Sequence, residues 1–167
     1  MRFGVIGGGS WATALAKILT DNRNPIQWWI RNEAIIRHLK ARHHNPQYLS
    51  SVYFDTRLLS LSSSVSDVVA ASDCLVMAVP SAYMAATLEG VDRNAFRGKK
   101  VLSAIKGILP EYNLLLNEYL EKEFGGVHRF LNSPYPDGAN SYVDRIEANL
   151  RELKQRLSEK RSLATKA

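Results

Sequence analysis

Short, continuous runs of apolar residues alternate, up to about residue 124, with segments whose apolar positions recur at helical spacing. The runs predict β-strands at residues 2–6, 26–30, 58–61, 74–79 and 100–104. The intervening segments predict helices at residues 10–20, 33–41, 65–71, 81–88 and 113–124. Because the strand runs are apolar throughout rather than alternating, helices are expected to cover both faces of the sheet. The pattern therefore predicts an α/β fold of the Rossmann type, with a doubly wound parallel sheet.

The pattern changes after residue 124. Residues 125–140 are rich in glycine and proline and predict a linker, because neither a helix nor a central strand tolerates such a segment. Within residues 141–167, apolar side chains recur at helical spacing among charged ones and predict one amphipathic helix: Ile146, Leu150, Leu153 and Leu157. This helix either packs on the first domain or pairs with another copy of the chain. The predicted organisation is a domain at 1–124, a linker and a helical tail.

The charge balance of the chain favours anionic partners. The net charge is +6, from 22 Lys and Arg against 16 Asp and Glu, which suits nucleotides, sugar phosphates or nucleic acid. The basic residues are scattered, however, so nucleic-acid binding is not expected. The sequence shows no membrane span and no signal peptide, and a cytoplasmic protein is predicted.

The cysteine and the histidines offer little chemistry. Cys74 is the one cysteine and lies in an apolar run, so it predicts a buried small side chain rather than a reactive thiol. The neighbouring His43 and His44 have no Cys, Asp or Glu at metal-ligand spacing, so no metal site is predicted.

A glycine-rich segment joins the first predicted strand to the first predicted helix. Residues 7–12, Gly7-Gly8-Gly9-Ser10-Trp11-Ala12, fit the dinucleotide-binding pattern G-x-G-x-x-A. In that pattern Gly7 permits the tight turn, Gly9 lets the pyrophosphate approach the backbone, and Ala12 keeps the helix close to the sheet. The helix N-terminus then supplies N–H groups and a positive dipole for the anion. The segment predicts a site for a nicotinamide dinucleotide.

Two basic residues follow other predicted strands at the edge where ligands of such sheets bind. Arg31 stands near the end of the second strand, where NAD-specific domains carry an acidic residue. A guanidinium there favours binding of NADP, or of both NAD and NADP. The nearby Glu33 leaves NAD as a possible cofactor. The alternative interpretation is that Arg31 is an exposed loop arginine with no role in binding. Lys106, followed by Gly107, is placed to meet a phosphate or a substrate oxygen, with a solvated lysine as the alternative.

Several segments in a fixed order carry a family resemblance: residues 7–16, Trp29-Ile30-Arg31-Asn32, Asn45-Pro46-Gln47-Tyr48-Leu49, Val79-Pro80-Ser81 and Ile105-Lys106-Gly107. Together they resemble NAD(P)-dependent glycerol-3-phosphate dehydrogenases of the bacterial type, over residues 1–124. The resemblance implies reversible hydride transfer between the nicotinamide and C2 of dihydroxyacetone phosphate or sn-glycerol 3-phosphate, which supplies the phospholipid backbone. It also implies cofactor contacts from Ser10, Trp11, Arg31 and Tyr48, and places Lys106 between nicotinamide and substrate.

The chain departs from the family after residue 124. The family continues into a Gly-Pro segment that binds substrate and a helical domain with the catalytic lysine, and residues 125–167 show neither, so no catalytic residue is assigned. One hypothesis is therefore a glycerol-3-phosphate dehydrogenase cofactor domain whose activity on its own stays open. The alternative is a non-catalytic dinucleotide-binding module with a C-terminal helix for self-association. The choice between NAD and NADP and the oligomeric state also stay open.

Overall fold

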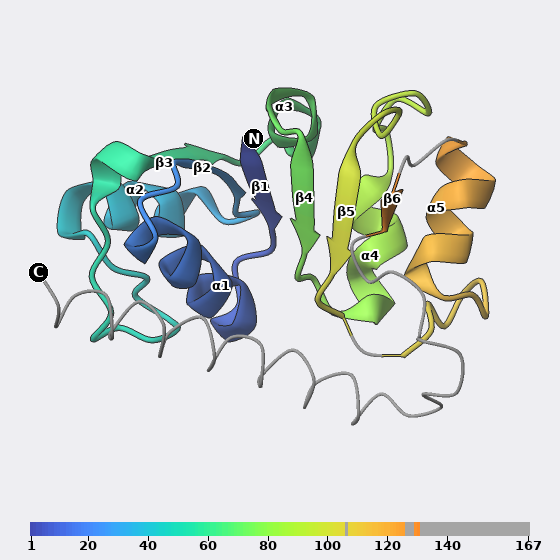
Figure 1. The fold of residues 1–167 in the computed structure, drawn as a ribbon. Helices are drawn as coiled ribbons and strands as arrows, with labels where there is room; N and C mark the ends of the chain where they lie inside the picture. The colour runs from blue at the N-terminus through green and yellow to red at the C-terminus, as the bar shows by residue number, and fades with distance from the viewer. Residues whose placement is uncertain (106, 126–128, 131–167) are drawn as a thin grey trace, which may run out of the picture. The chain divides into compact units, whose positions relative to one another are not determined.

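The sheet of the predicted domain is present and parallel throughout. A computed structural model describes residues 1–105, 107–125 and 129–130. Within these residues lie six strands in the order β3-β2-β1-β4-β5-β6 (Figure 1). Their bounds are β1 Phe3–Ile6, β2 Ile26–Trp29, β3 Leu59–Ser62, β4 Cys74–Met77, β5 Lys100–Ser103 and β6 Arg129–Phe130. The order reverses direction between β1 and β4, as in a Rossmann sheet.

Helices cover both faces of this sheet. They are α1 Ser10–Asp21, α2 Glu33–Arg42, α3 Val65–Ala71, α4 Ser81–Leu88 and α5 Leu116–Phe124, with a 3₁₀ turn at Thr56–Leu58. Buried residues of α1 and α2 share one apolar cluster with Val5, Trp28 and Val76 of the strands. Buried residues of α3, α4 and α5 share a second cluster with Ile6 and Met77. Because successive strand residues enter opposite clusters, the sheet is buried on both faces, and the doubly wound prediction is confirmed.

The last described helix starts later than the sequence predicted. α5 begins at Leu116 rather than at residue 113. Asn113 has a left-handed φ of 53°, and Leu109 and Leu114 form an isolated antiparallel bridge, so the preceding residues make a loop. The Glu118 carboxylate accepts a hydrogen bond of 2.8 Å from the Leu115 N–H and thereby satisfies a free donor at the helix start.

The sheet also continues beyond residue 124, inside the segment predicted as a linker. β6 pairs with β5 in parallel register, Arg129 beside Lys100 and Phe130 beside Val101. A strand of two residues is too short to produce a hydrophobic pattern, so the sequence did not reveal it. The predicted tail helix and the rest of the linker lie outside the described residues.

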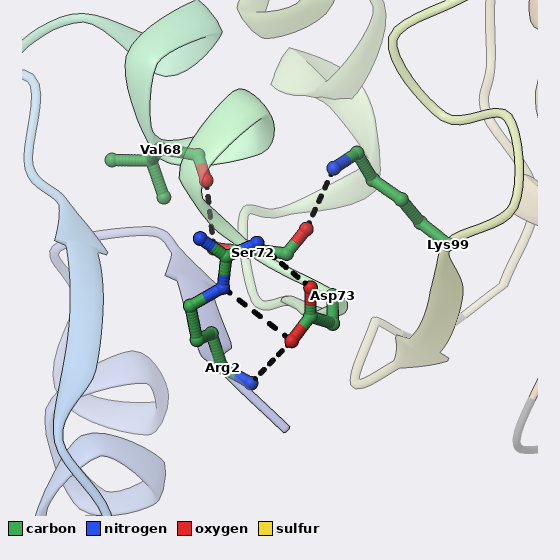
Figure 2. A network of polar contacts seen from close by, with 5 residues as sticks. All are labelled: Arg2, Val68, Ser72, Asp73 and Lys99. Atoms are coloured by element: carbon green, nitrogen blue, oxygen red, sulfur yellow. Dashed lines mark hydrogen bonds and ion pairs between the residues drawn. The ribbon is translucent and has the colours of Figure 1, made fainter.

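A polar network closes the edge of the sheet at which β1 and β4 begin (Figure 2). Asp73 accepts hydrogen bonds from the Arg2 backbone N–H at 2.7 Å and from the Arg2 guanidinium at 3.0 Å. The hydrogen bond from the Arg2 side chain is the main reason that the pKa of Asp73 falls to about 2. Lys99 donates to the Ser72 carbonyl at the C-terminal end of α3, where the helix dipole favours a cation. The network ties β1, β4 and the segment before β5 together.

Candidate functional site

The opposite edge of the sheet gathers the segments that the sequence singled out. Since β1 pairs in register with both β2 and β4, and β4 with β5, the residues that follow these strands emerge side by side. These residues are Gly7, Ile30, Ala78 and Ala104. Hydrogen bonds from Gly7 N to the Trp29 carbonyl and from Ala78 N to the Ile6 carbonyl extend the pairing to this edge. In open α/β sheets, ligands bind at this edge where the strand order reverses, here between β1 and β4.

The turn after β1 has a backbone that only glycine accepts at its first position. Gly7 has φ +139°, and a Cβ added there would lie 2.6 Å from the Ala78 carbonyl oxygen. The indole N–H of the buried Trp28 donates a 2.7 Å hydrogen bond to the Gly7 carbonyl. Trp28 thus supports the turn from within the core, where its ring also lies against Phe54.

The space above the third glycine is open. A Cβ added at Gly9 would meet no atom within 4 Å. Gly9 is the N-cap of α1, no side chain caps that helix, and its first turn holds no acidic residue. The backbone N–H groups at the start of the helix therefore have no side-chain cap and no acidic residue in their turn, which suits an anion.

The three residues after Gly9 take different positions. Ser10 is exposed and Trp11 has 55% of its surface exposed, whereas Ala12 is fully buried against the sheet. The small Ala12 lets α1 approach the sheet closely, as its place in the motif predicts.

A loop distant in sequence reaches the glycine turn through Asn45, which is fully buried. Its side-chain amide donates to Thr13 Oγ1 at 2.9 Å and to the Gly8 carbonyl at 3.3 Å. Its carbonyl oxygen accepts from the backbone N–H groups of Gln47 and Tyr48. The structure therefore connects the loop of Tyr48, whose side chain is 41% exposed, to the glycine turn. From the sequence alone Asn45 has no role of its own, although it begins the segment Asn45-Pro46-Gln47-Tyr48-Leu49 that carries part of the family resemblance.

Arg31 also lies beside the turn. It follows Ile30, whose side chain approaches within 3.0 Å of a Cβ built on Gly8. Arg31 is exposed, and in the described part of the chain no ion pair involves it. The Glu33 carboxylate, by contrast, accepts from Ser63 at 3.2 Å and pairs with Arg37 at 3.7 Å. Of these two charged groups, only the Glu33 carboxylate has a partner among the residues that the structure describes.

Lys106, which the sequence placed at this edge after β5, lies outside the described residues. Its neighbour Gly107 has a left-handed φ of +75° and is exposed.

The described residues contain no cluster of three or more metal-ligating side chains. The Nε2 atoms of His38 and His44 lie 3.3 Å apart, but these two histidines form only a pair. None of the helices that are described is both long enough and apolar enough to span a bilayer.

Comparison with known proteins gives one consistent family. Residues 2–132 match the model described as NAD-dependent glycerol-3-phosphate dehydrogenase N-terminus. Curated relatives named glycerol-3-phosphate dehydrogenase [NAD(P)+] include one from Nitratidesulfovibrio vulgaris strain DP4, 29% identical over 127 residues, which are 76% of this chain and 38% of that protein. Another, from Teredinibacter turnerae, is 33% identical over 127 residues, 76% of this chain and 37% of that protein.

Solved structures agree on the fold. The crystal structure of glycerol-3-phosphate dehydrogenase from Coxiella burnetii matches with a TM-score of 0.63 at 21% identity, over 74% of this chain and 38% of that one. An imine reductase from Streptomyces aurantiacus matches with a TM-score of 0.56 at 20% identity, over 75% of this chain and 38% of that one. The chain thus spans under two-fifths of the length of the first relatives that it matches.

Proposed function

Because this chain belongs to the NAD-dependent glycerol-3-phosphate dehydrogenase family, we propose that it binds NAD or NADP with the pyrophosphate over the glycine turn. The observation that carries the proposal is the open space above Gly9 at an uncapped helix N-terminus. Glycine at this point leaves the room that a pyrophosphate needs. The phosphate oxygens would then accept hydrogen bonds from N–H groups at the start of α1.

Other residues at the same edge supply the remaining contacts in this proposal. Gly7 and Ala12 shape the turn, and the exposed Ser10, Trp11 and Tyr48 line the approach to it. Arg31, two residues after the end of β2, meets the adenosine ribose, where its charge favours a 2′-phosphate. Lys106 is proposed to lie between the nicotinamide and the substrate, as the family resemblance implies.

The reaction proposed for the whole protein is the reversible reduction of dihydroxyacetone phosphate to sn-glycerol 3-phosphate. The nicotinamide supplies the hydride, while the protein positions it and provides positive charge at the carbonyl oxygen and the phosphate. Since the chain spans 38% of the relatives' length, the role proposed for this part is to hold the cofactor. Hydride transfer also needs a substrate held in reacting geometry, and no residue described here is assigned to that task.

Fluorescence titration of the full chain with NADH and NADPH tests the proposal. We expect saturable binding of both, tighter for NADPH, and expect Arg31→Ala to weaken NADPH by about tenfold while changing NADH little. Arg37→Ala, which removes an exposed arginine on α2 that pairs with Glu33, is the matched control. Absence of binding of either cofactor contradicts the proposal.

A second assay follows NADPH oxidation with dihydroxyacetone phosphate. If the chain binds cofactor but does not oxidise NADPH, it acts by itself as a non-catalytic cofactor-binding domain. Turnover shows instead that the chain is an enzyme by itself.

A further inference from the structure

The buried amide of Asn45 has hydrogen bonds that reach well beyond its own loop. Its Nδ2 group donates to two acceptors on the glycine turn and α1, the Gly8 carbonyl and Thr13 Oγ1. These partners lie 37 and 32 positions away in sequence. Its Oδ1 atom accepts two backbone N–H groups of its own loop, so every donor and acceptor of the amide is used. A fully satisfied and fully buried amide has one orientation.

The hydroxyl of Thr13 carries this interaction one step further. While accepting from Asn45, it donates a 2.8 Å hydrogen bond to the Gly9 carbonyl. The Gly9 carbonyl also accepts the Thr13 backbone N–H at 2.9 Å. The carbonyl groups of two consecutive glycines are therefore held by the pair Asn45 and Thr13.

The orientation of these carbonyls determines where the next N–H groups point. In a planar trans peptide the C=O and the N–H point in opposite directions. With the Gly8 carbonyl directed at Asn45, the N–H of Gly9 points away from the protein interior. With the Gly9 carbonyl directed into α1, the N–H of Ser10 likewise points away from the helix. Both donors therefore point outward from a turn at which a Cβ added to Gly9 would meet no atom within 4 Å.

We infer that Asn45 is a positioning residue for dinucleotide binding: with Thr13 it holds the glycine turn so that its N–H groups meet the pyrophosphate, and it anchors the loop of Tyr48 beside them. The inference rests on the proposed function. Donors that are already oriented cost no ordering free energy when the ligand binds, and affinity rises accordingly. Asn45 itself lies beneath the turn and is too deeply buried to contact the ligand.

The test is the dissociation constant of NADH, measured by fluorescence on the full chain well below its melting temperature. Asn45→Ala is expected to raise this constant by at least about tenfold. Asn45→Asp keeps the acceptor for Gln47 and Tyr48 but loses the donor, and is expected to weaken binding as well. Thr13→Val, which removes the bridging hydroxyl at nearly constant size, is expected to weaken binding, and Thr13→Ser to recover it. If Asn45→Ala does not fold, the comparison of Thr13→Val with Thr13→Ser still decides the question.

Asn24→Ala is the matched control. Asn24 is an amide that donates to the Leu19 and Asn22 carbonyls at the other end of α1. Its loss is expected to lower the melting temperature without changing the NADH dissociation constant. If the wild-type chain binds NADH and the Asn45 and Thr13 variants bind equally well, Asn45 is structural only and the inference is wrong. If the wild-type chain binds neither NADH nor NADPH, the proposed function fails instead.

Discussion

Two glycines of one turn are required for different physical reasons. Gly7 is needed by the fold, since both its φ of +139° and the adjacent Ala78 carbonyl exclude a side chain. Gly9 has an extended backbone, with φ −81° and ψ −175°, and no neighbour where a Cβ would lie. Among the described residues nothing requires glycine there, and we attribute the requirement to the proposed pyrophosphate.

Alanine substitutions should separate the two glycines. Gly7→Ala is expected to lower the free energy of unfolding by at least about 2 kcal/mol, through backbone strain and overlap. Gly9→Ala should stay within about 1 kcal/mol of wild type but weaken NADH binding, because the added methyl group lies where the pyrophosphate is proposed. Urea denaturation and NADH titration measure both quantities. Unchanged NADH affinity in Gly9→Ala speaks against the proposed cofactor position.

At the scale of elements, the two ends of the parallel strands carry different features. The edge at the carboxyl ends of the strands carries the turn and loops of the candidate site. The other edge carries the network of Arg2, Asp73 and Lys99, which joins β1 to β4 (Figure 2). Since β1 and β4 flank the point where the strand order reverses, their alignment also sets the geometry of the site at their far ends.

The pH dependence of stability should report this network. The pKa of Asp73 is lowered to about 2, so its stabilising contribution is complete above the unfolded-state pKa, near 4, and is lost as the pH falls towards 2. Asp73→Asn should therefore be less stable than wild type by a constant amount above about pH 5, with the difference shrinking below about pH 4. Because the pair is exposed, the difference should also shrink in salt. Urea denaturation of both proteins across this pH range measures it, and a difference that grows on acidification contradicts the assignment.

At the scale of the whole molecule, one sheet separates two apolar clusters. The cluster of α1 and α2 supports the glycine turn, and the cluster of α3, α4 and α5 supports the segments that follow β4 and β5. The candidate site lies across the boundary between them, where the strand order reverses between β1 and β4. Its geometry therefore depends on both halves being folded together.

Cofactor should accordingly stabilise the described domain as a unit. A ligand that binds only the folded state at 100 times its dissociation constant adds about 2.7 kcal/mol of stability. We expect NADPH to raise the melting temperature in one cooperative transition, followed by circular dichroism, and to have little effect on Gly9→Ala. If unfolding occurs in two steps and NADPH raises the melting temperature of only one of them, the two clusters do not support one site.

The sequence alone determined the α/β class, five of the strands, the position of the glycine turn and the family resemblance over residues 1–124. These are local properties: continuous apolar runs specify buried strands, and a glycine pattern between a strand and a helix specifies a turn. Only the tertiary structure decided the pairing of β6, the start of α5 and the place of Asn45. Each of these depends on partners remote in the chain, such as Lys100 for β6 and Thr13 for Asn45. A buried hydrogen bond between residues far apart in the chain leaves no periodic pattern in the sequence. Such a bond can therefore be recognised only in the folded structure.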